Sequence, residues 1–178
     1  MKPPLDVYIS LPRRILAGIF DECDKYDSAE TGGRILGFYS VDGSVLRVAV
    51  KALIGPGPNA RRNRTSLFQD GEYQERVFRA VEKQHPTIAH LGNWHTHHVN
   101  GLQVLSNGDA ETYRRTVNHK NHDTDFFYAL LVTSRLAYDG IGRYGFRNYI
   151  LFRGRQDIYD LADWRVSVSD EPVLALSS

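Results

Sequence analysis

The 178-residue sequence has little cysteine, little net charge and no long apolar run. Its single cysteine, Cys23, excludes a disulfide within the chain and leaves histidine and carboxylate as the side chains that would hold a metal ion. Basic and acidic residues nearly balance, 22 against 21, so the basic surface needed for sequence-independent nucleic-acid binding is missing. We therefore expect neither an internal disulfide nor a nucleic-acid partner.

Signals for membrane insertion and export are also missing. No stretch reaches about 18 apolar residues, the length that indicates a membrane span. The first six residues, Met-Lys-Pro-Pro-Leu-Asp, carry charge and lead into no apolar segment of the signal-peptide kind. With the lone cysteine, this favours a cytoplasmic protein that does not bind membranes. The length and the 42% hydrophobic composition predict one domain over 1–178, with its core at about 7–168.

Apolar residues recur at helical spacing in three places. A first helix is expected at about 11–26, with Cys23 on its apolar stripe, where a small buried hydrophobe is the ordinary role. A second helix is expected to follow an N-cap at Asp70 and to end near 85, before a proline. A third is expected at about 110–119.

Runs rich in β-branched and aromatic residues predict strands between these helices. The expected strands are 34–40, 44–54, 87–97, 125–134, 148–153 and, in preference to a short helix, 164–168. The Asp42-Gly43 turn predicts that the first two form an antiparallel hairpin. Gly140, Gly142 and Gly145 predict a second hairpin turn. Together the elements predict an α/β fold in which a mixed, largely antiparallel curved sheet is flanked by helices.

Two stretches are expected to lack regular structure. In 55–64, prolines and glycines alternate ahead of three arginines, which predicts a loop that is either a flap over a substrate or a solvated connector. The last residues, 171–178, show neither a charge pattern nor an apolar periodicity and are expected to fray.

The chemistry centres on the stretch 94–109. If its first part is a strand, the two-residue period places His95 and His97 on one face, side by side. Ser106 is a plausible N-cap of the next helix and would put Asp109 at the third helical position. Two imidazoles and one carboxylate, with a fourth position left to water, form the ligand set of a catalytic zinc site.

A second carboxylate is needed, because the attacking water must lose a proton that later reaches the leaving group. The candidate is Glu30, which precedes Gly32 and Gly33 at the start of the first strand. Two glycines beside an acid let another backbone or a substrate approach closely. Sequence distance does not establish that Glu30 meets the histidines.

These pieces together resemble the JAB/MPN family and its JAMM metalloprotease motif. The matching features are Glu30 before a glycine-containing strand, His95 and His97 at the end of a later strand, and Ser106 and Asp109 at the start of a helix. The resemblance spans about 7–168 and implies a cytidine-deaminase-like layering. It also implies that His95, His97 and Asp109 bind Zn²⁺, that Glu30 is the general base and that Ser106 hydrogen-bonds the oxyanion.

The resemblance further implies a function and partners. It implies a zinc-dependent isopeptidase or peptidase that hydrolyses the amide bond at the C-terminus of ubiquitin or a ubiquitin-like protein. The stretch 55–64 looks like that of prokaryotic members, which often accompany conjugation or sulfur-carrier systems, so activating and conjugating enzymes of the same operon are further partners. Two alternatives stay open: a peptidase that trims a sulfur-carrier protein, and a non-catalytic MPN-type scaffold.

The sequence departs from the family after the second histidine. His98 replaces the usual proline, and the segment 98–105 is one residue longer than is usual in the family. His98 could substitute as a ligand, but strand alternation turns it to the face opposite His97 and favours a structural role or one lining a substrate groove. After Asp109 there is little room for the second insertion with which some eukaryotic members select a chain linkage.

Overall fold

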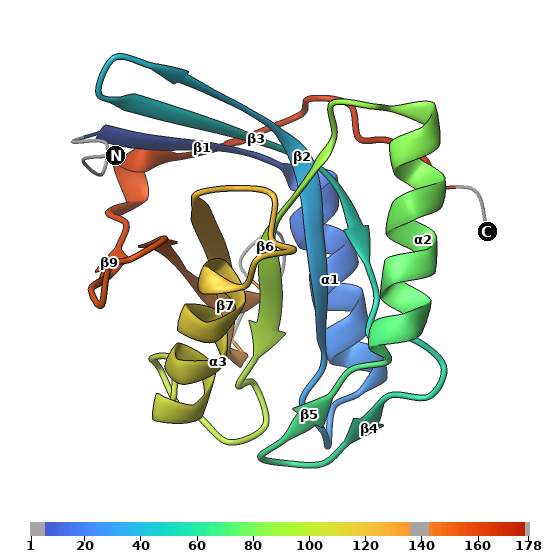
Figure 1. Cartoon of the computed structure of the whole chain (residues 1–178). Helices are drawn as coiled ribbons and strands as arrows, with labels where there is room; N and C mark the ends of the chain where they lie inside the picture. The colour runs from blue at the N-terminus through green and yellow to red at the C-terminus, as the bar shows by residue number, and fades with distance from the viewer. Residues whose placement is uncertain (1–5, 136–142, 177–178) are drawn as a thin grey trace.

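The computed structural model describes residues 6–135 and 143–176 (Figure 1). Within these ranges the elements are β1 (Asp6–Pro12), α1 (Arg13–Lys25), β2 (Gly32–Asp42), β3 (Val45–Ile54), β4 (Arg61–Arg62), β5 (Leu67–Phe68), α2 (Gly71–Gln84), β6 (Ala89–Thr96), α3 (Asn107–Asn118), β7 (Phe126–Arg135), β8 (Tyr144–Phe152), β9 (Ile158–Asp160), the 3-10 turn η1 (Asp163–Arg165) and β10 (Val166–Ser169). The α/β class predicted from the sequence is confirmed.

One curled sheet of eight strands organises the fold, in the order β10-β1-β3-β2-β6-β7-β8-β9. Four neighbouring pairs are antiparallel, namely β2–β3, β2–β6, β7–β8 and β8–β9. The pairs β1–β10, β1–β3 and β6–β7 are parallel. The sheet is therefore mixed, and β6 lies inside it with a partner on each side, which fixes the strand that carries the histidines.

The hairpin of β2 and β3 forms as predicted, around a turn in which Gly43 has a φ of 57°. Farther along, the register shifts between Leu36 and Gly37, where β3 carries one extra residue, Lys51. A bulge of this kind reverses which residues face each side of the sheet. Val50 accordingly packs in the core beside α1, whereas Ala52 packs beside α2.

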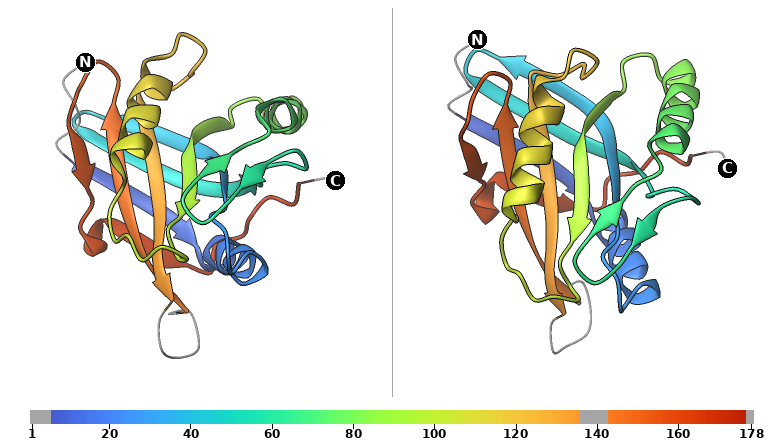
Figure 2. Two further views of the ribbon diagram at one scale, coloured as in Figure 1. Left: turned by 90° about the horizontal axis from the view of Figure 1, so that it is seen from below. Right: turned by 60° about the horizontal axis from the view of Figure 1, so that its bottom comes forward.

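The helices cover both faces of the sheet (Figure 2). The apolar stripe of α1, including the buried Cys23, packs against alternate residues of β1, β3 and β7. The other alternate residues of β7, among them Phe127 and Leu131, pack against Tyr113 and Val117 of α3. Helix α2 packs over Leu36 of β2 and over Ala52 and Ile54 of β3. This two-sided burial follows from the period of two along each strand.

The start of the chain differs from the prediction. Residues 6–12 form β1, which was not predicted, and the first helix begins at Arg13 instead of near Leu11. Leu11 is buried in β1 but also continues the apolar spacing of the helix, so periodicity alone assigned it to the wrong element. Pairing with β3 and β10 on both sides decides the strand.

The second and third helices agree closely with the prediction. Asp70 caps α2, and its side chain accepts a hydrogen bond from the backbone N–H of Tyr73. Ser106 caps α3, so that helix begins a few residues before the predicted 110.

The later strands are partly corrected. β8 begins at Tyr144, earlier than the predicted 148, and Gly145 lies within it instead of in a turn. Gly140 and Gly142 lie outside the described residues. The predicted last strand is present as β10, preceded by η1.

The C-terminal segment is not frayed through its described part. The backbone N–H of Leu174 donates to the carbonyl of Lys51, and the side chains of Leu174 and Leu176 pack against the α2 core. Apolar contacts supplied by another element decide this order, and the local sequence carries no signal of them. In the described part of the chain, no helix is long and apolar enough to cross a membrane.

Candidate metal centre

The two histidines come together at the end of β6. His95 pairs with Gly32 of β2 and Leu131 of β7, and the backbone N–H of His97, just past the strand, donates to the carbonyl of Val132. Both side chains are buried, and their ring centroids lie 4.9 Å apart with nearly perpendicular planes. The prediction that they share a face is confirmed, while Trp94 points into the core on the other side of the strand.

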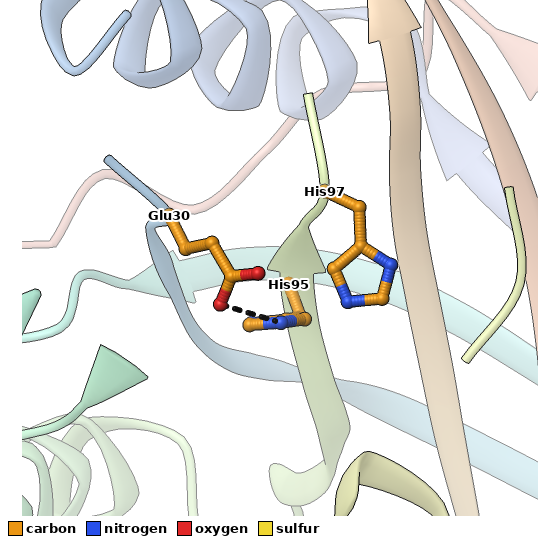
Figure 3. A group of neighbouring side chains, drawn as sticks. All are labelled: Glu30, His95 and His97. Atoms are coloured by element: carbon orange, nitrogen blue, oxygen red, sulfur yellow. Dashed lines mark ion pairs between the residues drawn. The ribbon is translucent and has the colours of Figure 1, made fainter. Parts of the chain in front are cut away.

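Glu30, which lies two residues before β2, directs its side chain to the same place (Figure 3). Thr31 and Thr96 tie the start of β2 to the end of β6: the Thr31 N–H donates to Thr96 Oγ1 at 2.9 Å, and the Thr96 N–H donates to the Thr31 carbonyl at 3.0 Å. Glu30 is only 3% exposed, and its Oε2 lies 3.4 Å from His95 Nε2. The fold thus brings the predicted acid to the histidines.

Close backbone approach at the two glycines permits this arrangement. A Cβ on Gly32 would lie 2.7 Å from the carbonyl oxygen of Trp94 and 2.8 Å from Leu67 Cδ2. A Cβ on Gly33 would lie 1.9 Å from the carbonyl oxygen of Ile54. The interpretation that the glycines serve close approach is confirmed, and the groups that approach are the neighbouring strands and the side chain of Leu67.

Asp109 enters from the first turn of α3, held by a capping box. Its backbone N–H donates to Ser106 Oγ, and its Oδ2 accepts from the backbone N–H and the hydroxyl of Ser106, at 2.9 and 2.6 Å. Asp109 Oδ2 also lies 3.1 Å from His97 Nε2, and Oδ1 lies 3.6 Å from His95 Nε2. The predicted cap and helical position of both residues are confirmed. The oxyanion role of Ser106 stays a prediction, and its hydroxyl here donates to Asp109.

The two carboxylates have matching arrangements around His95. Glu30 Oε1 accepts a hydrogen bond from the side-chain amide of Asn100 at 2.7 Å, as Asp109 Oδ2 accepts from Ser106. The other oxygen of each carboxylate faces His95 Nε2. Each acid therefore has one oxygen bonded to a neighbouring side chain and the other facing His95, and Asp109 Oδ2 in addition contacts His97.

This donor set fits a metal ion. Glu30, His95 and His97 each offer a ligand atom, and these atoms all lie within 4.8 Å of one another. Asp109 contacts both imidazoles and adds a fourth donor. Together Glu30, His95, His97 and Asp109 form the metal group. Two buried acids that face two imidazoles concentrate negative charge where a cation would compensate it.

The charges in the group shift several pKa values. Burial lowers the pKa of His97, but the hydrogen bond to Asp109 and the negative charges of Asp109 and Glu30 outweigh burial and leave that pKa raised. Burial raises the pKa of Asp109, whereas His97, His95 and Ser106 together bring it well below its ordinary value. Asp109 is therefore ionised at neutral pH and remains available as an anionic ligand.

Two residues near the group were not predicted from the sequence. Tyr113 is buried one helical turn after Asp109, and burial followed by the negative charges of Asp109 and Glu30 raises the pKa of its phenol. Asn100 lies in the segment 98–105, where a single asparagine in a loop has no distinguishing pattern. Only the spacing of four between Asp109 and Tyr113 could have placed Tyr113 on the same helix face.

His98 has a structural contact away from the group. Its Nε2 donates to the backbone carbonyl of Tyr26 at 2.9 Å, and its ring lies edge-on to Tyr144 with centroids 5.8 Å apart. This agrees with the predicted turn of His98 to the face opposite His97.

The prediction that the whole stretch 55–64 lacks regular structure is wrong for its last part. Arg61 and Arg62 pair with Leu67 and Phe68 in the two-stranded β4–β5 ribbon. The Asn63 carbonyl accepts the backbone N–H of Glu30 at 2.8 Å, so the ribbon lies directly beside the group. Pairing with residues beyond the stretch supplies the order that its own composition disfavours.

A separate hollow of about 530 Å³ lies over β1, β2, β3 and η1. Its lining includes Tyr8, Tyr39, Arg47, Trp164 and Glu171, and none of the four residues of the metal group. It therefore offers no second access to that group.

Comparison with known proteins finds a similar fold but gives no information on the candidate site. No protein-family model matches the sequence, and no curated protein matches it either. The fold is similar to the solution structure of protein DSY2949 from Desulfitobacterium hafniense, with a TM-score of 0.59 and 13% sequence identity over 92% of this chain and 94% of that one. At this identity the similarity shows a shared fold alone.

Proposed function

We propose that this protein is a zinc-dependent peptidase of the JAMM type that hydrolyses the amide bond at the C-terminus of a ubiquitin-like protein. The observation that carries the proposal is the convergence of Glu30, His95, His97 and Asp109 from three separate segments of the chain onto one place. Their order and local settings also match the sequence motif that resembles the JAB/MPN family.

Zinc is the ion that suits these donors best. Two imidazoles with carboxylate oxygens and no thiolate, in a site with a position left for water, are typical of catalytic zinc. On this proposal His95, His97 and Asp109 hold the ion. Bound there, zinc would supply a Lewis acid that lowers the pKa of a water molecule toward about 7.

The chain's own residues then handle the proton and the substrate. Glu30 Oε2 accepts a proton from the attacking water and later returns it to the leaving amine, which suits a carboxylate buried beside His95. Ser106 holds Asp109 through its single O–H, and on this proposal that O–H would turn from Asp109 to the developing oxyanion during the reaction. No covalent intermediate with the protein is needed.

An extended polypeptide is the proposed substrate. The β4–β5 ribbon lies beside Glu30, and a strand edge of this kind can bind an extended chain through backbone hydrogen bonds. The ubiquitin-like identity of that chain, a prokaryotic conjugation system and a cytoplasmic location rest on the motif resemblance and on the single cysteine.

The test uses purified full-length protein loaded with zinc and a panel of ubiquitin-like proteins that carry a C-terminal peptide fusion. We expect cleavage directly after the ubiquitin-like C-terminus and about one zinc per chain, with Glu30→Gln lowering the rate by about 10²–10⁴-fold while zinc is retained. His97→Ala should lose both zinc and activity. Absence of cleavage across the panel would refute the peptidase, and substoichiometric zinc that His97→Ala leaves unchanged would favour a scaffold.

A further inference from the structure

Asn100 connects three segments around the metal group. Its Nδ2 donates to Glu30 Oε1 at 2.7 Å and lies 3.4 Å from the backbone carbonyl oxygen of Arg64, while its Oδ1 accepts the backbone N–H of Leu102 at 3.0 Å. The turn that presents it is fixed by His97, whose carbonyl accepts the backbone N–H groups of Asn100 and Gly101. One exposed side chain thus links the turn after a histidine, the β4–β5 ribbon and the buried acid.

The hydrogen bond from Asn100 ties one oxygen of Glu30 away from His95 and leaves the other facing it. A buried carboxylate needs donors for its oxygens, and the Asn100 amide satisfies Oε1. Oε2 then faces His95 Nε2 at 3.4 Å. Since the amide is neutral, it orients the carboxylate without cancelling the charge that proton transfer requires.

The same bond bears on whether Glu30 acts as a metal ligand or as the acceptor of a proton. Glu30, His95 and His97 by themselves form a group able to hold a metal ion, and Asp109 contacts both histidines as well. If both carboxylates bound the ion, no acid would remain to accept the proton. Asp109 directs both its oxygens at the histidines, Oδ1 at His95 and Oδ2 at His97. In Glu30, by contrast, Asn100 ties Oε1 to the turn after His97 and Oε2 faces His95.

We propose that Asn100 is a positioning residue that holds one oxygen of Glu30 away from the metal ion, so that Glu30 does not bind the ion through both oxygens and stays available for proton transfer. This inference rests on the proposed peptidase function. Without the amide, Oε1 loses its donor, and the carboxylate is free to turn both oxygens toward a cation. A variant without the amide should therefore bind the metal more tightly and catalyse more slowly. If Asn100 only supported the turn after His97, the same variant would instead bind the metal more weakly.

The test measures zinc affinity by competition with a chromophoric chelator and kcat and KM on the fusion substrate, for the wild type and Asn100→Ala. We expect the variant to bind zinc more tightly, to lose about 100-fold in kcat through misplacement of the acid, and to change KM little. Gln103→Ala is the matched control, since Gln103 is exposed in the same loop and its side-chain amide donates to the Gly101 carbonyl instead of to Glu30. Thermal unfolding checks that each variant folds.

A double-mutant cycle with Glu30→Gln distinguishes the mechanism. If Asn100 acts through the Glu30 carboxylate, Asn100→Ala should change zinc affinity in the wild-type background and leave it unchanged in the Glu30→Gln background. Weaker or unaltered zinc binding by Asn100→Ala, or an equal change in both backgrounds, would overturn the inference. Affinity is measured without substrate, so this result stands apart from any failure to find peptidase activity.

Discussion

Replacement of Gly33 by alanine tests how the fold brings the two halves of the metal group together. Gly33 is buried in β2 between β3 and β6, opposite Trp94. An added Cβ would lie 1.9 Å from the carbonyl oxygen of Ile54 and 2.6 Å from Trp94 Nε1. Real Cβ atoms essentially never come within 3.0 Å of such neighbours, so β2 must move relative to β3 or β6.

The expected cost is large because backbone is in the way. Overpacking a core against side chains typically costs about 1–3 kcal/mol, and a strand carbonyl in a ladder cannot rotate aside as a side chain does. We expect Gly33→Ala to lower the free energy of unfolding by about 3 kcal/mol or more, which corresponds to roughly 6–12 °C in Tm for a chain of this size. A displaced β2 also moves Glu30 and Gly32 relative to His95, so zinc affinity should fall as well.

The matched control is Gly18→Ala. Gly18 is exposed in the middle of α1, and a Cβ there would have no heavy atom within 4 Å. Alanine in a helix interior is more stable than glycine by about 0.5–1 kcal/mol, so this variant should be stabilised. Urea unfolding followed by circular dichroism, in the presence of a chelator, measures both. A loss below about 1 kcal/mol for Gly33→Ala, or a shift of the same sign in both variants, would refute the reasoning.

Three further predictions concern the metal, pH and the helix cap. Zinc at 100 times its dissociation constant should raise the free energy of unfolding by about 2.7 kcal/mol, and a calorimetric scan of His97→Ala should show no such rise. Ser106→Ala should cost about 1 kcal/mol through the lost cap and slow hydrolysis by about 100-fold or more with zinc retained, as metal analysis and rate assays would show. Burial, and then the charge of Arg34, lower the pKa of His90 from 6.5 to about 3. Its contribution to stability is therefore complete above pH 6.5 and is lost as the pH falls toward 3, by up to about 1.4 kcal/mol per pH unit, and His90→Gln should reduce this loss in acid unfolding curves.

Local patterns in the sequence determined much of the site. The alternation of a strand placed His95 and His97 on one face, because that period is set by backbone geometry and not by neighbours. The spacing of Ser106 and Asp109 predicted a capping box, because both hydrogen bonds close within one helical turn. The same holds for the β2–β3 hairpin and the Asp70 cap, whose determinants are all within a few residues.

Tertiary structure alone decided how these pieces meet. The strand β1, the β4–β5 ribbon and the packed C-terminal segment exist because distant residues pair with them or bury them, and such partners leave no trace in local periodicity. The contact of Glu30 with His95 depends on the pairing of β2 with β6, and the hydrogen bond from Asn100 to Glu30 depends on the turn that follows His97. The sequence by itself determined which residues are the candidate metal ligands, and the sheet register decided that the second carboxylate faces them, because long-range strand pairing is what sets that distance.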